Sequence, residues 1–150
     1  MRDFQFPGRS PVRATEAMAA TSHPLATLAA IEMLRSGGNA MDAAVCAAAV
    51  QAVVEPQSTG IGGDCFVLYC PKGQGEVLAF NGSGRAPTAA TVDWYLENGF
   101  SELPKQGPHA VTIPGAVDAW CRLLEDHGRK GIADALAPAI HYAENGYVVH

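Results

Sequence analysis

Two neighbouring stretches of apolar residues at helical spacing lie in the first third of the chain. Before the first stretch, Ser22 is a favoured helix cap, and Pro24 lies in the first turn, where a missing N–H costs nothing. The apolar positions continue to Leu34, and Arg35 and Ser36 then precede two glycines. Because glycine readily adopts the left-handed conformation that ends helices, the sequence predicts a first helix over about residues 22–35.

The second stretch is apolar on almost every side. Asn39 is a favoured cap, and a Glu-Pro pair stops the pattern, so we expect a helix over about residues 40–54. Asp42 and Gln51 are almost its only polar positions. A helix that is hydrophobic all round is buried on several sides. The two helices are therefore expected to form a hairpin packed deep in the domain.

A loop of small residues and a pair of short strands come next. Residues 57–64 are mostly glycine, serine and threonine, whereas Cys65–Cys70 and Glu76–Phe80 are nearly continuous apolar runs. The segment Pro71–Gly75 between the two runs has the composition of a turn. The sequence therefore predicts a two-stranded hairpin, in which cysteine thiols would be too desolvated to act as nucleophiles.

The second half of the chain predicts three more helices and one more strand. A short helix begins at Thr91, a brief strand covers residues 109–114, and a helix begins at Gly115. The last helix spans about residues 132–144, and Pro138 inside it is expected to bend the helix or break it in two. This mixture of elements is α+β. The chain ends on apolar residues that would normally lead into another element, so it reads as an incomplete domain.

The composition fits one globular domain that binds neither nucleic acid nor membranes. A length of 150 residues allows about one domain, and 48% of the residues are hydrophobic. The net charge of −5 has the wrong sign for a phosphate-binding surface. The longest apolar run, Ala43–Val50, is far shorter than the roughly 18 residues that cross a bilayer. No secretory signal is visible, so we expect a cytoplasmic protein.

Few residues carry an obvious chemistry of their own. The four cysteines lack zinc or redox spacing, and we expect buried, reduced thiols, with a disulfide between two of them left open. The histidines are scattered, so no metal site is expected. The glycines at 60, 62 and 63 lie after a helix and before a strand, the reverse of a phosphate-binding loop. No serine lies in a nucleophile elbow. We expect no cofactor and no catalytic residue in this chain.

Arg85 is the charged residue that the pattern singles out. It follows two permissive glycines, precedes an Ala-Pro pair, and lies beyond the end of the second predicted strand. An arginine on such a fixed backbone can present its planar fork to a carboxylate. A plain surface arginine, or an arginine in a structural salt bridge, fits the same pattern, and these alternatives stay open.

Several motifs, taken together and in order, resemble the start of the large subunit of the γ-glutamyltransferase family. They are Ala20–Ala26, Gly37–Ala44, Glu55–Gly63, Arg85–Pro87, Ala110–Gly115 and Pro138–Gly146. The Gly-Gly-Asn-Ala-x-Asp-Ala-Ala run and the Gly-Ile-Gly-Gly loop are the most specific of them. The resemblance covers roughly residues 12–150 and leaves residues 1–11 as an irregular N-terminal segment.

This resemblance implies an N-terminal-nucleophile hydrolase, a four-layer αββα sandwich of which this chain is an incomplete N-terminal part. Such a protein is made as one precursor that cuts itself before a threonine. The freed threonine uses its own α-amine as base and attacks a γ-glutamyl amide to form an acyl-enzyme. That threonine belongs to the small subunit, so the implied partners are the remainder of the precursor and an acyl-amide substrate.

The sequence departs from the family at one position that matters for the substrate. The family places an arginine that holds the glutamyl α-carboxylate where this chain has Ser83, two residues before Arg85. Residues two apart in an extended segment point to the same side, so Arg85 is expected to reach the same groove from a shifted origin. Ser83 and Arg85 are therefore the candidate substrate-binding residues. A cephalosporin-acylase-like hydrolase of non-glutamyl amides and a truncated, non-catalytic module are the alternatives.

Overall fold

A computed structural model describes residues 11–149 of the chain. Residues 1–10 and His150 lie outside the described residues, and with them almost all of the segment expected to be irregular over residues 1–11. The described elements are α1 (Pro24–Arg35), α2 (Ala40–Val54), β1 (Phe66–Tyr69), η1 (Pro71–Gly73), β2 (Leu78–Asn81), α3 (Val92–Glu97), η2 (Pro108–Ala110), α4 (Ala116–His127) and α5 (Ile132–Asn145). The mixed helix and sheet content confirms the α+β class at this coarse level.

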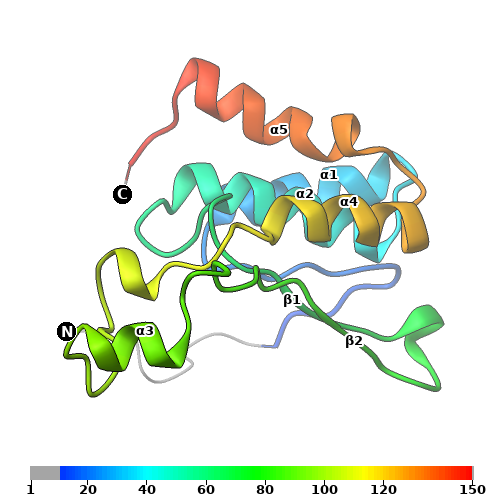
Figure 1. Cartoon of the computed structure of the whole chain (residues 1–150). Helices are drawn as coiled ribbons and strands as arrows, with labels where there is room; N and C mark the ends of the chain where they lie inside the picture. The colour runs from blue at the N-terminus through cyan, green and yellow to red at the C-terminus, as the bar shows by residue number, and fades with distance from the viewer. Residues whose placement is uncertain (1–10, 150) are drawn as a thin grey trace.

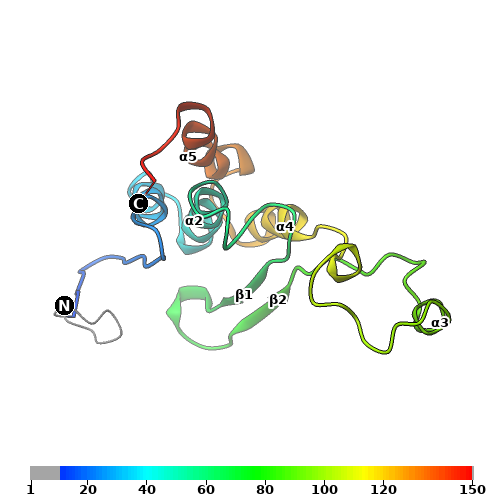
Figure 2. The same cartoon turned by 90° about the vertical axis from the view of Figure 1, so that its left-hand side faces the viewer.

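Helix α2 is the centre of a helical layer. It packs against α1, α4 and α5. Figure 2 shows α2 between α1 and α4, with α5 on one side of these helices and the β1–β2 hairpin on the opposite side. Its buried side chains are mostly alanine and valine, which let the neighbouring helices approach closely, and Val50 is completely buried. The prediction of a helix buried on several sides is confirmed.

The start of α2 is fixed by a pair of polar side chains. Asn39 Oδ1 accepts hydrogen bonds from the backbone N–H groups of Met41 (2.9 Å) and Asp42 (3.1 Å), and Asp42 Oδ2 accepts from the Asn39 N–H (2.7 Å). This reciprocal arrangement is a capping box, and it confirms Asn39 as the cap. Asp42 is fully buried, so it does not give α2 a polar face.

The cap of α1 differs from the sequence prediction. His23, not Ser22, occupies the cap position, and its Nδ1 accepts a hydrogen bond of 3.1 Å from the Leu25 N–H. The Ser22 hydroxyl instead donates to the Glu55 carboxylate beyond the end of α2 and accepts from Gln51 Nε2 (2.7 Å). The prediction was one residue off because a contact between α1 and α2 takes the serine hydroxyl away from its own helix.

The two predicted strands pair as an antiparallel hairpin. Phe66 lies opposite Asn81 and Tyr69 opposite Leu78. Alternate residues of β1 face the helical layer, whereas Phe66 and Leu68 on the other face are 68% and 78% exposed. The hairpin is therefore confirmed, and one face of it is an apolar surface that the described residues leave uncovered.

The strand predicted over residues 109–114 is wrong, and of the two outcomes predicted for Pro138 the break is wrong. Residues 109–114 do not form a strand: η2 ends at Ala110, and an irregular segment follows. Prolines at 108 and 114 cannot donate to a ladder, and Ile113 N–H makes a single link to the Arg85 carbonyl (3.0 Å). Pro138 does not break the last helix, because α5 runs without interruption through it. Ala135 and Ala139 are buried before and after the proline, and α5 packs on α2, so tertiary contacts stabilise the helix on both sides of it.

Helix α3 lies apart from the helical layer. Figure 1 and Figure 2 show it at the end of a long excursion between β2 and α4, away from α1, α2 and α5. Across residues 11–149, none of the helices combines the length and the apolar character needed to span a membrane.

Candidate functional site

Three chain segments cross at one point, which we call the glycine junction, made of residues 63–65, 82–85 and 112–116. Backbone hydrogen bonds join each of the three segments to the other two. Gly82 N–H donates to the Cys65 carbonyl (2.7 Å), and Gly115 N–H donates to the Gly63 carbonyl (3.1 Å). Ile113 N–H donates to the Arg85 carbonyl (3.0 Å). The junction therefore fixes the backbone on which Ser83 and Arg85 are carried.

The junction requires residues without a side chain. A Cβ atom on Gly84 would lie 1.2 Å from the Ile113 carbonyl oxygen, and one on Gly115 would lie 2.4 Å from the Gly82 oxygen. At Gly82 it would meet the Ala119 Cβ at 2.5 Å. Close backbone approach, which glycine alone allows, explains all three positions. The glycine-rich sequence after β2 therefore allows close packing of backbone segments.

Asp64 ties the junction together with its side chain. Its Oδ1 accepts hydrogen bonds from the Gly84 N–H (3.3 Å) and from the Thr112 hydroxyl (3.4 Å). Sequence reasoning missed both Asp64 and Thr112. The available signal was an acidic residue directly before an apolar strand in a loop otherwise made of small residues.

Ser83 and Arg85 differ in how they are held. Ser83 is half-buried, and both its N–H (3.0 Å) and its hydroxyl (2.5 Å) donate to Asn81 Oδ1. Arg85 is exposed, and among residues 11–149 its guanidinium makes no ion pair. A structural salt bridge within the described residues is therefore ruled out for Arg85, and its guanidinium is accessible to a carboxylate ligand.

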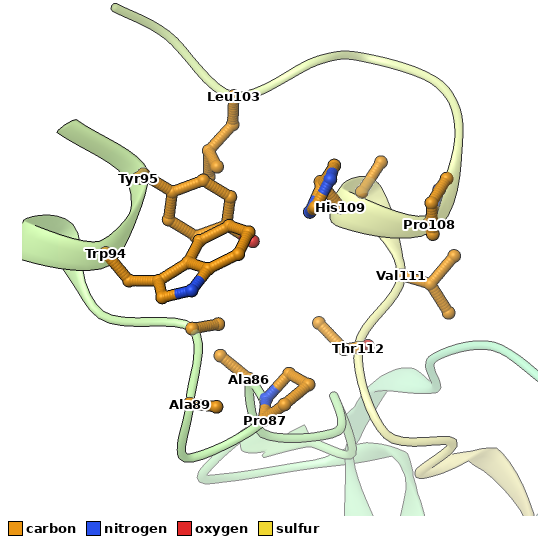
Figure 3. Close-up of a pocket in the computed structure, with 12 residues that line it drawn as sticks. Ala86, Pro87, Ala89, Trp94, Tyr95, Leu103, Pro108, His109, Val111 and Thr112 are labelled. Carbon is orange, nitrogen blue, oxygen red and sulfur yellow. The ribbon is translucent and has the colours of Figure 1, made fainter. Parts of the chain in front are cut away.

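A cavity of about 470 Å³ opens directly beside this segment. Figure 3 shows the rings of Trp94 and Tyr95 on one side of it and His109 on the other, with Ala86 and Pro87 below. Sequence reasoning did not find this cavity, because its lining residues are spread from position 86 to position 112 without a recognisable spacing.

Two of the four cysteines, Cys46 and Cys65, have thiols that are poor nucleophiles. All four are free. Burial, with a smaller contribution from the charge of Glu32, raises the pKa of the Cys46 thiol to about 11. Burial also raises the pKa of Cys65, against a smaller lowering by a hydrogen bond with Trp120. Both thiols therefore stay protonated near neutral pH. Within residues 11–149, no three His, Cys, Asp or Glu side chains gather closely enough to hold a metal ion.

Comparison with known proteins decides the family. The family model described as Gamma-glutamyltranspeptidase matches residues 26–150, most of the chain. The chain belongs to the gamma-glutamyltranspeptidase family. It corresponds to the N-terminal part of the family's large subunit, so the resemblance that the sequence motifs carried is confirmed.

The relatives include hydrolases of more than one kind. A glutathione hydrolase-like YwrD proenzyme of Bacillus subtilis is 44% identical over 90% of this chain and 26% of its own length. A gamma-glutamyltranspeptidase structure from Helicobacter pylori is 35% identical, with a TM-score of 0.81 over 91% of this chain and 40% of that one. A cephalosporin acylase structure from Bacillus halodurans is 41% identical, with a TM-score of 0.79 over 96% and 28%.

This member of the gamma-glutamyltranspeptidase family is described over only part of the length of its relatives. The chain spans about a quarter of the curated relatives that it matches. The described residues supply a helical layer, a hairpin and the glycine junction. Arg85 is exposed beside the junction, and the cavity adjoins the same segment.

Proposed function

We propose that the whole protein cleaves amides as gamma-glutamyltranspeptidases do, and that this chain forms one wall of its substrate groove. The family match over residues 26–150 carries this proposal. The attacking threonine then comes from a small subunit of the same precursor. In this arrangement the helices of the chain form an outer layer, and the β1–β2 hairpin joins one sheet, of an αββα sandwich.

The proposed reaction proceeds by acyl transfer. The threonine hydroxyl attacks the amide carbonyl while the α-amine of the same threonine takes up the hydroxyl proton. The C–N bond of the tetrahedral intermediate then breaks, and the leaving amine departs with that proton. Water or an acceptor amine attacks the resulting ester and releases the threonine. Backbone N–H groups that stabilise the oxyanion would lie with the threonine, and this chain binds and orients the acyl group.

Arg85 is proposed to bind a carboxylate on the acyl group. An exposed guanidinium on a backbone fixed at the glycine junction offers two parallel donors to such a group. Ser83 occupies the position at which the resemblance places the family's carboxylate-binding arginine. Its hydroxyl is already engaged with Asn81, so its proposed part is to shape the groove and leave the charge to Arg85.

A second candidate function is an acylase that acts on non-glutamyl amides. Serine in place of the family arginine favours it, because a hydroxyl cannot replace a bidentate cation for an α-carboxylate. The cephalosporin acylase from Bacillus halodurans is 41% identical to this chain, so an acylase stands among its relatives beside the glutathione hydrolase-like YwrD proenzyme at 44%.

Two chromogenic substrates separate these functions. The whole protein should be assayed with γ-glutamyl-p-nitroanilide and with glutaryl-p-nitroanilide, which differ only in the α-ammonium group. Preference for the first supports the γ-glutamyl function, and preference for the second supports the acylase. If neither is cleaved by a self-processed protein, the proposal of amide cleavage is contradicted, and a non-catalytic role stands in its place.

A further inference from the structure

Part of the cavity wall directly follows Arg85 in the chain, and another part precedes a residue that is hydrogen-bonded to the Arg85 backbone. Ala86 and Pro87, which follow Arg85 directly, line the cavity, and so does Thr112. The next residue, Ile113, donates its N–H to the Arg85 carbonyl at 3.0 Å. Consecutive Cα atoms are about 3.8 Å apart, so the wall of the cavity begins within one residue of the arginine. A ligand bound in the cavity therefore lies beside the backbone that carries Arg85.

Aromatic rings that contact one another and small alanine side chains keep the cavity open. Trp94 and His109 have ring centroids 5.8 Å apart, and Tyr95 and His109 have ring centroids 5.5 Å apart, so each ring is held by others. The Phe100 ring also contacts this group, with its centroid 5.0 Å from the centroid of the His109 ring. Alanines fill much of the remaining wall and leave space. Aromatic walls around about 470 Å³ are typical of small-molecule sites, which range over about 300–1,000 Å³.

The lining discriminates against charged groups. None of the described lining residues is an aspartate, glutamate, lysine or arginine. An ammonium group in this cavity would lose water and gain no carboxylate partner, so attraction to the Trp94 and Tyr95 ring faces would offset its desolvation only in part. A hydrocarbon or aromatic group would instead be removed from water and would stack on the Trp94 and Tyr95 rings.

We propose that the cavity binds an aromatic or branched hydrocarbon substituent on the acyl group of the substrate, beside the carboxylate that Arg85 holds. This inference rests on the proposed function and specifies its substrate class: a half-amide of a dicarboxylic acid with an apolar substituent next to the free carboxylate. The amide end of that substrate extends away from the cavity, toward the threonine supplied by the rest of the protein.

Binding of two product-like acids to the whole protein tests the inference without turnover. Isothermal titration calorimetry should compare glutarate with 2-phenylglutarate, which adds one phenyl group beside a carboxylate. The wild type should bind 2-phenylglutarate about tenfold more tightly, as one stacked ring contributes about 1.4 kcal/mol. Trp94→Ala should reduce this preference to about twofold or less and leave glutarate affinity unchanged. Val92→Ala, on the same helix but 73% exposed and outside the cavity, should keep the full preference.

A second variant controls for collapse of the cavity in Trp94→Ala. Ala89→Phe fills the space and removes none of the rings, and it should abolish the preference in the same way. Equal affinity of the wild type for the two acids overturns the inference. This is also the result expected if another part of the protein fills the cavity. A preference retained in both Trp94→Ala and Ala89→Phe also overturns it.

The outcomes separate this inference from the proposed function. Hydrolysis of the glutaryl or γ-glutamyl anilide without a phenyl preference leaves the amidase proposal standing and overturns the subsite. A phenyl preference that is lost in Trp94→Ala, in a protein that cleaves no amide, establishes the subsite and contradicts the amidase.

Discussion

The carboxylate of Asp42 accepts hydrogen bonds from the backbone N–H of Arg129, 87 positions along the chain, at 3.0 Å from each of its oxygens. The N–H of Lys130 donates to the same carboxylate at 3.0 Å. A residue that caps α2 therefore also holds the α4–α5 connection against the start of that helix. Asn39 adds to this link, because its Nδ2 donates to the His127 carbonyl at 2.7 Å.

Replacing Asp42 should be strongly destabilising. Asp42→Ala leaves the backbone N–H groups of Asn39, Arg129 and Lys130 without their acceptor and removes half of the capping box, so we expect the free energy of unfolding to fall by about 3 kcal/mol. Urea denaturation of the whole protein, followed by circular dichroism, measures this. Asp118→Ala is the matched control, since its exposed pair with Arg122 should contribute less than about 1 kcal/mol. Equal effects of the two substitutions would contradict the role given to Asp42.

A methyl group at Gly84 should disrupt the glycine junction. The new Cβ would lie 1.2 Å from the Ile113 oxygen, so the two backbone segments must separate. We expect Gly84→Ala to cost about 3 kcal/mol and to reduce affinity for carboxylate-bearing substrates, because the Arg85 backbone moves with it. Gly131→Ala is the control, because no atom lies within 4 Å of a Cβ there. A Gly84→Ala protein as stable and active as the control would show that the crossing is looser than described.

Local signals predicted the helical layer because helix ends are decided by neighbouring residues. Asn39 and the alanine-rich stretch after it define α2 without reference to the rest of the chain. The misplaced cap at Ser22 and the supposed break at Pro138 share a different cause. In each case a contact with α2, from Ser22 through Gln51 and from the α5 face around Ala135, outweighed a local preference.

The candidate site was predictable only in part. Arg85 was recognisable from its glycine-rich approach, and the structure leaves it without an ion pair in the described region. The crossing that holds it depends on Gly63 and Gly115 meeting from distant parts of the chain, which no spacing encodes. The cavity likewise forms only when η2 replaces the expected strand and brings His109 to face Trp94.

Removing the Arg85 guanidinium should weaken substrate binding more than turnover. For glutaryl-p-nitroanilide we expect Arg85→Ala to raise KM about 10- to 100-fold with little change in kcat, since a charge-assisted pair contributes about 1.5–3 kcal/mol. Arg85→Lys should restore only part of this affinity, because an ammonium lacks the planar fork. Arg122→Ala, an exposed arginine on α4, is the control. An unchanged KM in Arg85→Ala would remove Arg85 from the substrate site.

The buried thiol of Cys46 should make stability depend on alkaline pH. Burial raises its pKa from 9.0 to about 11, so the folded state keeps the proton in a range where the unfolded chain has lost it. The stabilisation is fully present below pH 9 and is lost as pH rises through 11, with a magnitude of at most about 3 kcal/mol. Urea denaturation between pH 7 and 11 should therefore show a smaller alkaline loss for Cys46→Ala than for the wild type. Below pH 8 the two curves should differ only by a constant cavity cost, and curves that stay parallel up to pH 11 would contradict the raised pKa.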